Sequence, residues 1–158
     1  MLVVSTSDYL WFVDQALDAM VAIVRELGDD RASTRPDLAG ANAPYAILTH
    51  CLGVMEYWGG ALVAGRTIAR DRDAEFQAQG PVDDLARRTA EARRQLETDL
   101  ALLEATAPPR QTPGLPEDAA SPIGLTQGGV LLHLYEELTQ HLGQLELTRD
   151  VLVARPGT

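Results

Sequence analysis

Residues 125–153 read LTQGGVLLHLYEELTQHLGQLELTRDVLV. This stretch combines a helical apolar pattern with the strongest candidates for functional residues in the chain. Apolar residues recur three and four positions apart, which predicts one long amphipathic helix. The residues that set its apolar arc are Val130, Leu134, Leu138 and Leu145. His133, Glu137 and His141 are spaced four residues apart, so each is turned about 40° around the helix from the one before.

These three polar residues lie at different angles to the apolar arc. On a helical wheel His141 falls inside the arc, Glu137 lies just outside its edge, and His133 lies farther out. An imidazole and a carboxylate that face a protein core are costly unless a partner satisfies them, and a metal ion would do so. The alternatives are a hydrogen-bonded core histidine and a surface pair of Glu137 with His141. For His133 we expect a place on the helix surface, or a role in orienting a ligand or assisting proton transfer.

The remainder of the chain shows three further helical patterns and no useful alternation typical of a strand. The helices predicted in this way span about residues 7–27, 44–64, 82–106 and 125–153. A stretch rich in Pro and Gly, 107–124, is expected to form a long loop. Four amphipathic helices in 158 residues predict a single all-α domain, 1–158, folded as a four-helix bundle with long interhelix connections.

Several local features of the first two helices can be predicted. Thr6 or Ser7 is expected to cap the first helix, and Gly28 is expected to end it. Trp11 and Trp58 are expected to lie in the core. The adjacent glycines at 59 and 60 weaken the second helix locally but permit close approach of another helix.

The second helix supplies a further candidate ligand, His50, at the edge of its apolar face. If the second and fourth helices are neighbours, His50 can meet Glu137 and His141. Two imidazoles and one carboxylate suit Zn²⁺ or another first-row divalent ion with an open coordination position. Cys51 points about 100° away from His50, so we interpret it as a buried structural cysteine rather than a reactive thiol.

Composition excludes several classes of function. The chain has 23 acidic and 13 basic residues and a formal charge of −10, which argues against binding to nucleic acid. A single cysteine cannot form an internal disulfide and favours a reducing cytoplasm. The first residues carry Asp8 and Asp14 without a basic segment, so no secretory signal is expected. No apolar run approaches the roughly 18–20 residues that a membrane span requires.

Three stretches together resemble a known family. They are PYAILTHCLGVMEYWGGALVAGR at 44–66, RDRDAEFQAQG at 70–80 and LLHLYEELTQHLGQLELTRDVL at 131–152. The chain resembles the DinB-like metal-binding four-helix bundles, in particular the mycothiol- and bacillithiol-dependent S-transferases. The final stretch is similar to that family's H-x-x-E-E-x-x-x-H-x-G motif.

The resemblance implies a specific site and cofactor. In such families one His of the second helix and an (H/E)-x-x-x-H pair of the last helix hold a divalent metal. Carried onto this sequence, these ligands are His50, Glu137 and His141, with zinc favoured and nickel, iron or manganese as alternatives. Glu137, the second of these three ligands, is similar to the glutamate ligand in the metal-binding domain of mycothiol-dependent maleylpyruvate isomerase. That isomerase uses an additional C-terminal domain, whereas this sequence stops at Thr158, so isomerisation is not expected. The resemblance also implies a homodimer.

Three functions remain open from the sequence. The leading hypothesis is a thiol-dependent S-transferase, in which the metal activates a mycothiol-like thiol for attack on a small electrophile. The second is a metal-dependent hydrolase that activates water, although the sequence shows no dedicated general base. The third is a non-enzymatic dimeric metal-binding module.

Overall fold

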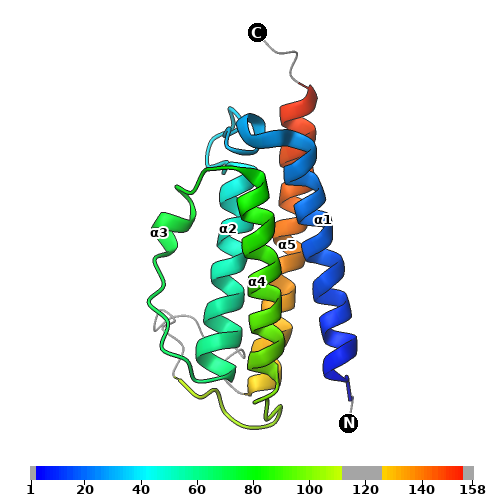
Figure 1. Ribbon diagram of the computed structural model, residues 1–158, viewed down its shortest axis with the longest axis vertical. Coiled ribbons are helices and arrows are strands. Elements are labelled where there is room, and N and C mark those ends of the chain that lie inside the picture. Colours follow the sequence, from blue (N-terminus) through cyan, green and yellow to red (C-terminus); the bar gives the residue numbers. More distant parts are fainter. Residues whose placement is uncertain (1–2, 112–125, 155–158) are drawn as a thin grey trace.

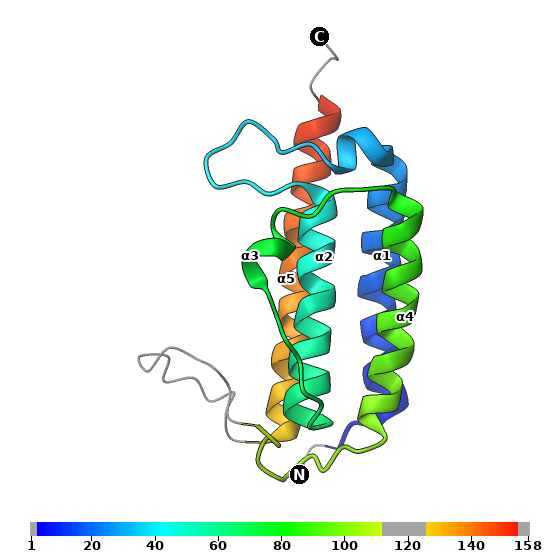
Figure 2. The ribbon, with the colours of Figure 1, turned by 60° about the vertical axis from the view of Figure 1, so that its left-hand side comes forward.

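The computed structural model describes residues 3–111 and 126–154, and within these ranges it contains helices and no strands. In chain order the elements are α1 (Thr6–Ala32), α2 (Pro44–Met55), the π-helix η1 (Glu56–Val63), α3 (Arg72–Glu75), α4 (Val82–Leu100) and α5 (Gln127–Ala154). The four long helical rods run side by side, and α3 lies outside them beside α2 (Figure 1; Figure 2). The predicted all-α four-helix bundle is therefore confirmed.

The order of the helices around the bundle decides which faces can meet. α1 packs against both α4 and α5, and α2 also packs against both of them. α2 and α5 are therefore neighbours, the arrangement on which the encounter of His50 with α5 depends. No helix in the described parts of the chain is long and apolar enough to cross a membrane.

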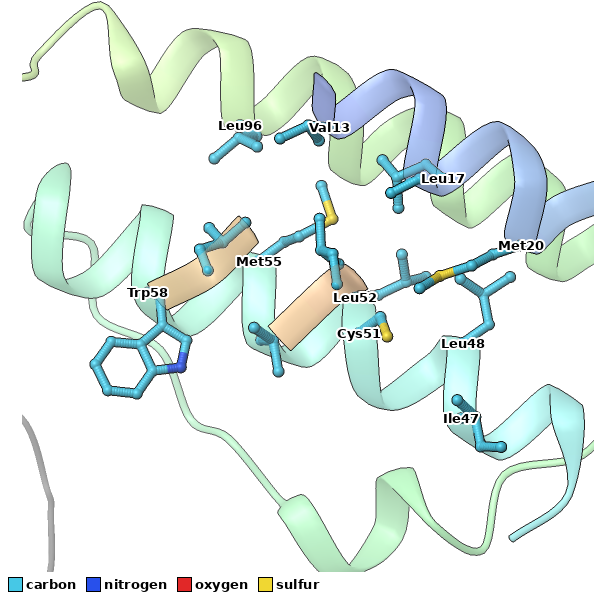
Figure 3. Close-up of a cluster of buried hydrophobic side chains, with 14 of the residues drawn as sticks. Val13, Leu17, Met20, Ile47, Leu48, Cys51, Leu52, Met55, Trp58 and Leu96 are labelled. Carbon is cyan, nitrogen blue, oxygen red and sulfur yellow. The ribbon is translucent and has the colours of Figure 1, made fainter. Parts of the chain in front are cut away.

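The bundle core combines residues of α1, α2, η1, α4 and α5 (Figure 3). Trp58 and Cys51 belong to it, as expected, with 6% and 0% of their surface exposed. Burial raises the pKa of the Cys51 thiol well above its usual range, which keeps the thiol protonated and unreactive. The prediction that Trp11 lies in the core is wrong. Trp11 is 56% exposed and makes a T-shaped ring contact with Phe12 on the outer side of α1.

Both predicted limits of the first helix need correction. Ser5, rather than Thr6 or Ser7, is the N-cap, and its hydroxyl accepts a hydrogen bond from the Asp8 amide. Gly28 interrupts the helical backbone with φ of 69°, but a further helical segment continues to Ala32. A glycine adopts this positive φ at little cost. Gly28 therefore marks a kink between two helical segments rather than the end of the helix.

The second helix extends nearly as predicted, but its last part is a π-helix. Gly59 and Gly60 lie in this part, and both are buried. A Cβ atom on Gly59 would lie 2.6 Å from Leu96 Cδ1 of α4, closer than any real contact. The predicted close approach of another helix is therefore confirmed.

The third predicted helix ends at Leu100, six residues before the expected position near 106. The reason lies in the first turn of α5. The Gln127 side chain accepts a hydrogen bond from the Glu104 amide and donates one to the Pro108 carbonyl. The Glu104 amide and the Pro108 carbonyl are thus satisfied by a tertiary contact instead of a continued helix. Most of the predicted long loop, residues 112–124, lies outside the described residues.

Candidate metal centre

Two helices bring His50, Glu137 and His141 together. His50 extends from α2, and the other two residues extend from α5. Glu137 Oε2 lies 3.8 Å from His50 Nε2 and 3.5 Å from His141 Nε2. One ligand atom from each residue lies within 4.8 Å of the other two. The sequence-based expectation that these residues meet across neighbouring helices agrees with this geometry.

The cluster lies at the edge of the core. His50 is almost completely buried, with 3% of its side chain exposed, whereas Glu137 and His141 expose 27% and 21%. The site is therefore closed by protein on the α2 side and accessible to solvent on the α5 side.

The other ring nitrogen of each cluster histidine has an oxygen partner. His50 Nδ1 lies 2.7 Å from Glu75 Oε2, and His141 Nδ1 lies 2.8 Å from Gln144 Oε1. Carboxylate and amide oxygens accept hydrogen bonds, so each Nδ1 carries the hydrogen and donates it. Each Nε2 is then the nitrogen left for a metal, and both lie within 3.8 Å of Glu137 Oε2. Hydrogen bonding of the distal nitrogen to an oxygen is the usual arrangement of metal-binding histidines.

The charges in the cluster favour an ionised carboxylate. The neighbouring imidazoles of His141 and His50 hold the pKa of Glu137 far below its usual range, and they outweigh the opposing effect of burial. The nearby Glu137 carboxylate also raises the pKa of His141, against a smaller opposing effect of burial. A carboxylate with two convergent imidazole nitrogens is a donor set that fits a first-row divalent ion.

Glu137 and His141 should make the stability of the metal-free protein depend on pH. The raised pKa of His141 stabilises the fold fully below the ordinary value of 6.5, and this contribution is lost as pH rises through the folded-state pKa. The lowered pKa of Glu137 contributes above its ordinary 4.5 and is lost only in strong acid. Urea unfolding should therefore show that the pair stabilises the protein more at pH 6 than at pH 8.5. Glu137→Gln should flatten this decline, and equal slopes for variant and wild type would contradict the assignment.

His133 lies beside the three-donor cluster rather than within it. Its Nε2 is 3.7 Å from Glu137 Oε1, and its Nδ1 is 3.3 Å from Glu136 Oε2. The edge of its ring meets Trp58, with 4.6 Å between the ring centroids. Only 15% of the side chain is exposed, which is less than expected for a helix-surface residue. The π-helix η1 contributes to the site by supplying Trp58.

Sequence reasoning assigned no role to two charged residues beside His50. Arg70 precedes α3 and Glu75 ends it, and the Arg70 guanidinium binds both Glu75 oxygens at 2.7 and 2.9 Å. Burial raises the pKa of Glu75. Hydrogen bonds from Arg70 and His50 together lower this pKa by more, so the net shift is downward. No local pattern signals this contact, because Glu75 lies in a charged connecting stretch and 25 residues separate it from His50.

The all-α bundle and the position of the His50, Glu137 and His141 cluster agree with the DinB-like class that the sequence resembles. The sequence profile of the mycothiol-S-transferase family matches residues 9–154. The chain belongs to the mycothiol-S-transferase family. A comparison with curated proteins finds no match.

Proposed function

We propose that this protein is a metal-dependent S-transferase that joins a low-molecular-weight thiol, of the mycothiol type, to a small electrophile. The convergence of ligand atoms from His50, Glu137 and His141 within 4.8 Å supports the proposal most directly. Membership of the mycothiol-S-transferase family adds the thiol and the reaction class. The proposed ligands are these three residues, and zinc is the favoured ion, with nickel, iron or manganese as alternatives.

Each residue of the cluster has a defined part in this proposal. His50 and His141 each offer an Nε2 atom, and Glu137 offers an ionised carboxylate. Three protein ligands leave a coordination position open for substrate. A divalent cation bound there lowers the pKa of a thiol and so favours the nucleophilic thiolate.

The reacting thiol comes from solution rather than from the chain. Cys51 is fully buried, and burial raises the pKa of its thiol. In the transfer the S–H bond is broken, the sulfur electron pair forms a C–S bond, and the leaving group departs with the pair from its broken bond to carbon. The proton of the thiol needs an acceptor near the cluster, and we assign this role to His133 Nε2.

The direct test uses mycothiol and monochlorobimane. Attack of the thiol on the bimane methylene carbon forms a C–S bond and releases chloride, and fluorescence reports the product. We expect a rate that requires both the metal-loaded protein and the thiol. A metal-dependent loss of substrate that proceeds equally without thiol would instead indicate a hydrolase. No metal-dependent rate with several thiols and electrophiles would indicate a non-enzymatic binding module.

His133→Gln should separate proton transfer from metal binding. The amide cannot accept a proton at neutral pH, so we expect the transferase rate to fall by about 100-fold, at the lower end of typical acid–base contributions. Metal content should stay at the wild-type level, because His133 lies outside the three-donor cluster. An unchanged rate, or a loss of metal, would contradict the assigned role.

We also propose that the protein forms a homodimer, as the family resemblance implies. The exposed aromatic residues Trp11 and Phe12 of α1 offer apolar surface for such an association. Light scattering coupled to size exclusion measures the mass directly. A monomeric mass at micromolar concentration would contradict this proposal.

A further inference from the structure

The segment between η1 and α4 returns along the outer side of α2 and carries the short helix α3 (Figure 2). At the end of α3, the Glu75 side chain is directed against α2 and is only 10% exposed. Its Oε2 accepts the hydrogen of His50 Nδ1 at 2.7 Å. The guanidinium of Arg70 holds both oxygens of the same carboxylate. A continuous chain of charge-assisted hydrogen bonds therefore links Arg70 through Glu75 to His50.

The surface of α2 is shaped to admit this carboxylate. Gly53 lies next to Glu75, and a Cβ atom there would lie 2.0 Å from Glu75 Oε1. Gly53 lies in the interior of α2, where Gly favours the helix less than Ala does. The absence of a side chain at Gly53 thus provides the space that the Glu75 carboxylate occupies.

The contact also fixes the orientation of the His50 ring. Phe76 stacks on its face, with 4.5 Å between the centroids and 25° between the planes. The Nδ1 hydrogen bond sets the rotation of the ring within that plane. With Nδ1 donating to Glu75, Nε2 is the nitrogen left free of hydrogen, and it lies 3.8 Å from Glu137 Oε2.

We propose that Glu75 is a positioning residue of the metal centre, which selects the His50 tautomer with a free Nε2 and holds that nitrogen toward Glu137 and His141. Arg70 keeps the Glu75 carboxylate in place. This inference rests on the proposed function, because it needs His50 to be a metal ligand. If Glu75 serves only to fasten the loop to α2, its replacement should change stability but neither the tautomer nor the metal affinity.

Two variants perturb the contact in different ways. Glu75→Gln keeps the size of the side chain but replaces an oxygen acceptor by an amide that also donates. Gly53→Ala keeps the carboxylate but places a methyl group where Oε1 lies, and Ala itself favours the helix. Asp73→Asn is the matched control, because it removes one negative charge from an exposed position of the same helix.

The first measurement uses the metal-free protein, so it does not depend on the proposed metal. Nitrogen-15 spectra of the histidine side chains at pH 8 should show His50 of the wild type and of Asp73→Asn with its hydrogen on Nδ1. Glu75→Gln and Gly53→Ala should show a mixture of tautomers. A wild-type His50 with its hydrogen on Nε2 would overturn the inference.

The second measurement is a Zn²⁺ titration against a competing chelator. Loss of an orienting partner typically weakens metal binding by about 10- to 100-fold, and we expect this loss in Glu75→Gln and Gly53→Ala but not in Asp73→Asn. Equal affinity in all four proteins, or an equal loss in Asp73→Asn, would overturn the inference. A wild type that binds no Zn²⁺ would instead contradict the proposed function, and the spectra of the metal-free protein would still report the orientation of His50.

Discussion

His141→Ala should remove the metal and the S-transferase activity together. The variant keeps His50 and Glu137 but loses one of only three proposed protein ligands, and two ligands rarely hold a divalent ion against exchange with solvent. We expect metal content to fall from about one ion per chain, the stoichiometry of a three-ligand site, to nearly none. The conjugation rate should fall to that of the uncatalysed reaction. Elemental analysis of the purified protein and the bimane assay measure the two losses.

A second histidine variant on the same helix provides the control. His133 is eight residues before His141 and lies beside the donor cluster, with its Nε2 3.7 Å from Glu137. His133→Ala should retain the metal even though its rate falls. Circular dichroism should show the same helix content in both variants, because each side chain lies at the edge of the core. Stoichiometric metal in His141→Ala would contradict the ligand assignment, whatever happened to the rate.

The sequence predicted those parts of the fold that depend on the periodic burial of one helix face. The arc of α5 that contains Val130, Leu134, Leu138 and Leu145 is fully buried, as its spacing indicates. The same spacing placed His141 nearest to that arc. Adjacency of α2 and α5 did not follow from periodicity, because an apolar face indicates that a helix packs but not which helix it meets.

Features that depend on contacts between distant residues were not predictable from local patterns. The end of α4 at Leu100 depends on Gln127, which satisfies the Glu104 amide from the start of α5. Likewise, Glu75 meets His50 only because the segment after η1 turns back along α2. An acidic residue in a charged stretch is usually solvated, so neither its burial nor its partner has a sequence signal.

Residues of the site and residues of the core occupy adjacent positions along α5. Leu134 and Leu138 are fully buried, yet each is next to a polar residue of the site, His133 or Glu137. A substitution that alters the backbone of α5 therefore affects both the packing and the geometry of the donor atoms. Activity loss in a core variant has meaning only when stability is measured in the same protein.

Leu134→Ala should cause the largest loss of stability among simple variants of α5. Leu134 is 0% exposed, and removing its side chain leaves a cavity between α5 and η1 near Gly59. Such a change typically costs about 2–5 kcal/mol of the free energy of unfolding. At about 2–4 °C per kcal/mol for a domain of this size, Tm should fall by roughly 4–20 °C.

Leu132→Ala is the matched control, because the same substitution is made in the same helix at a position that is 70% exposed. Its change in helix propensity is identical, so the difference between the two variants isolates burial. We expect its free energy of unfolding to change by at most about 0.5 kcal/mol, as for most surface substitutions. Urea unfolding of both metal-free proteins at one pH measures the difference. Equal losses in the two variants would mean that Leu134 does not pack in the core as described, and the register of α5, on which the position of Glu137 and His141 depends, would then be wrong.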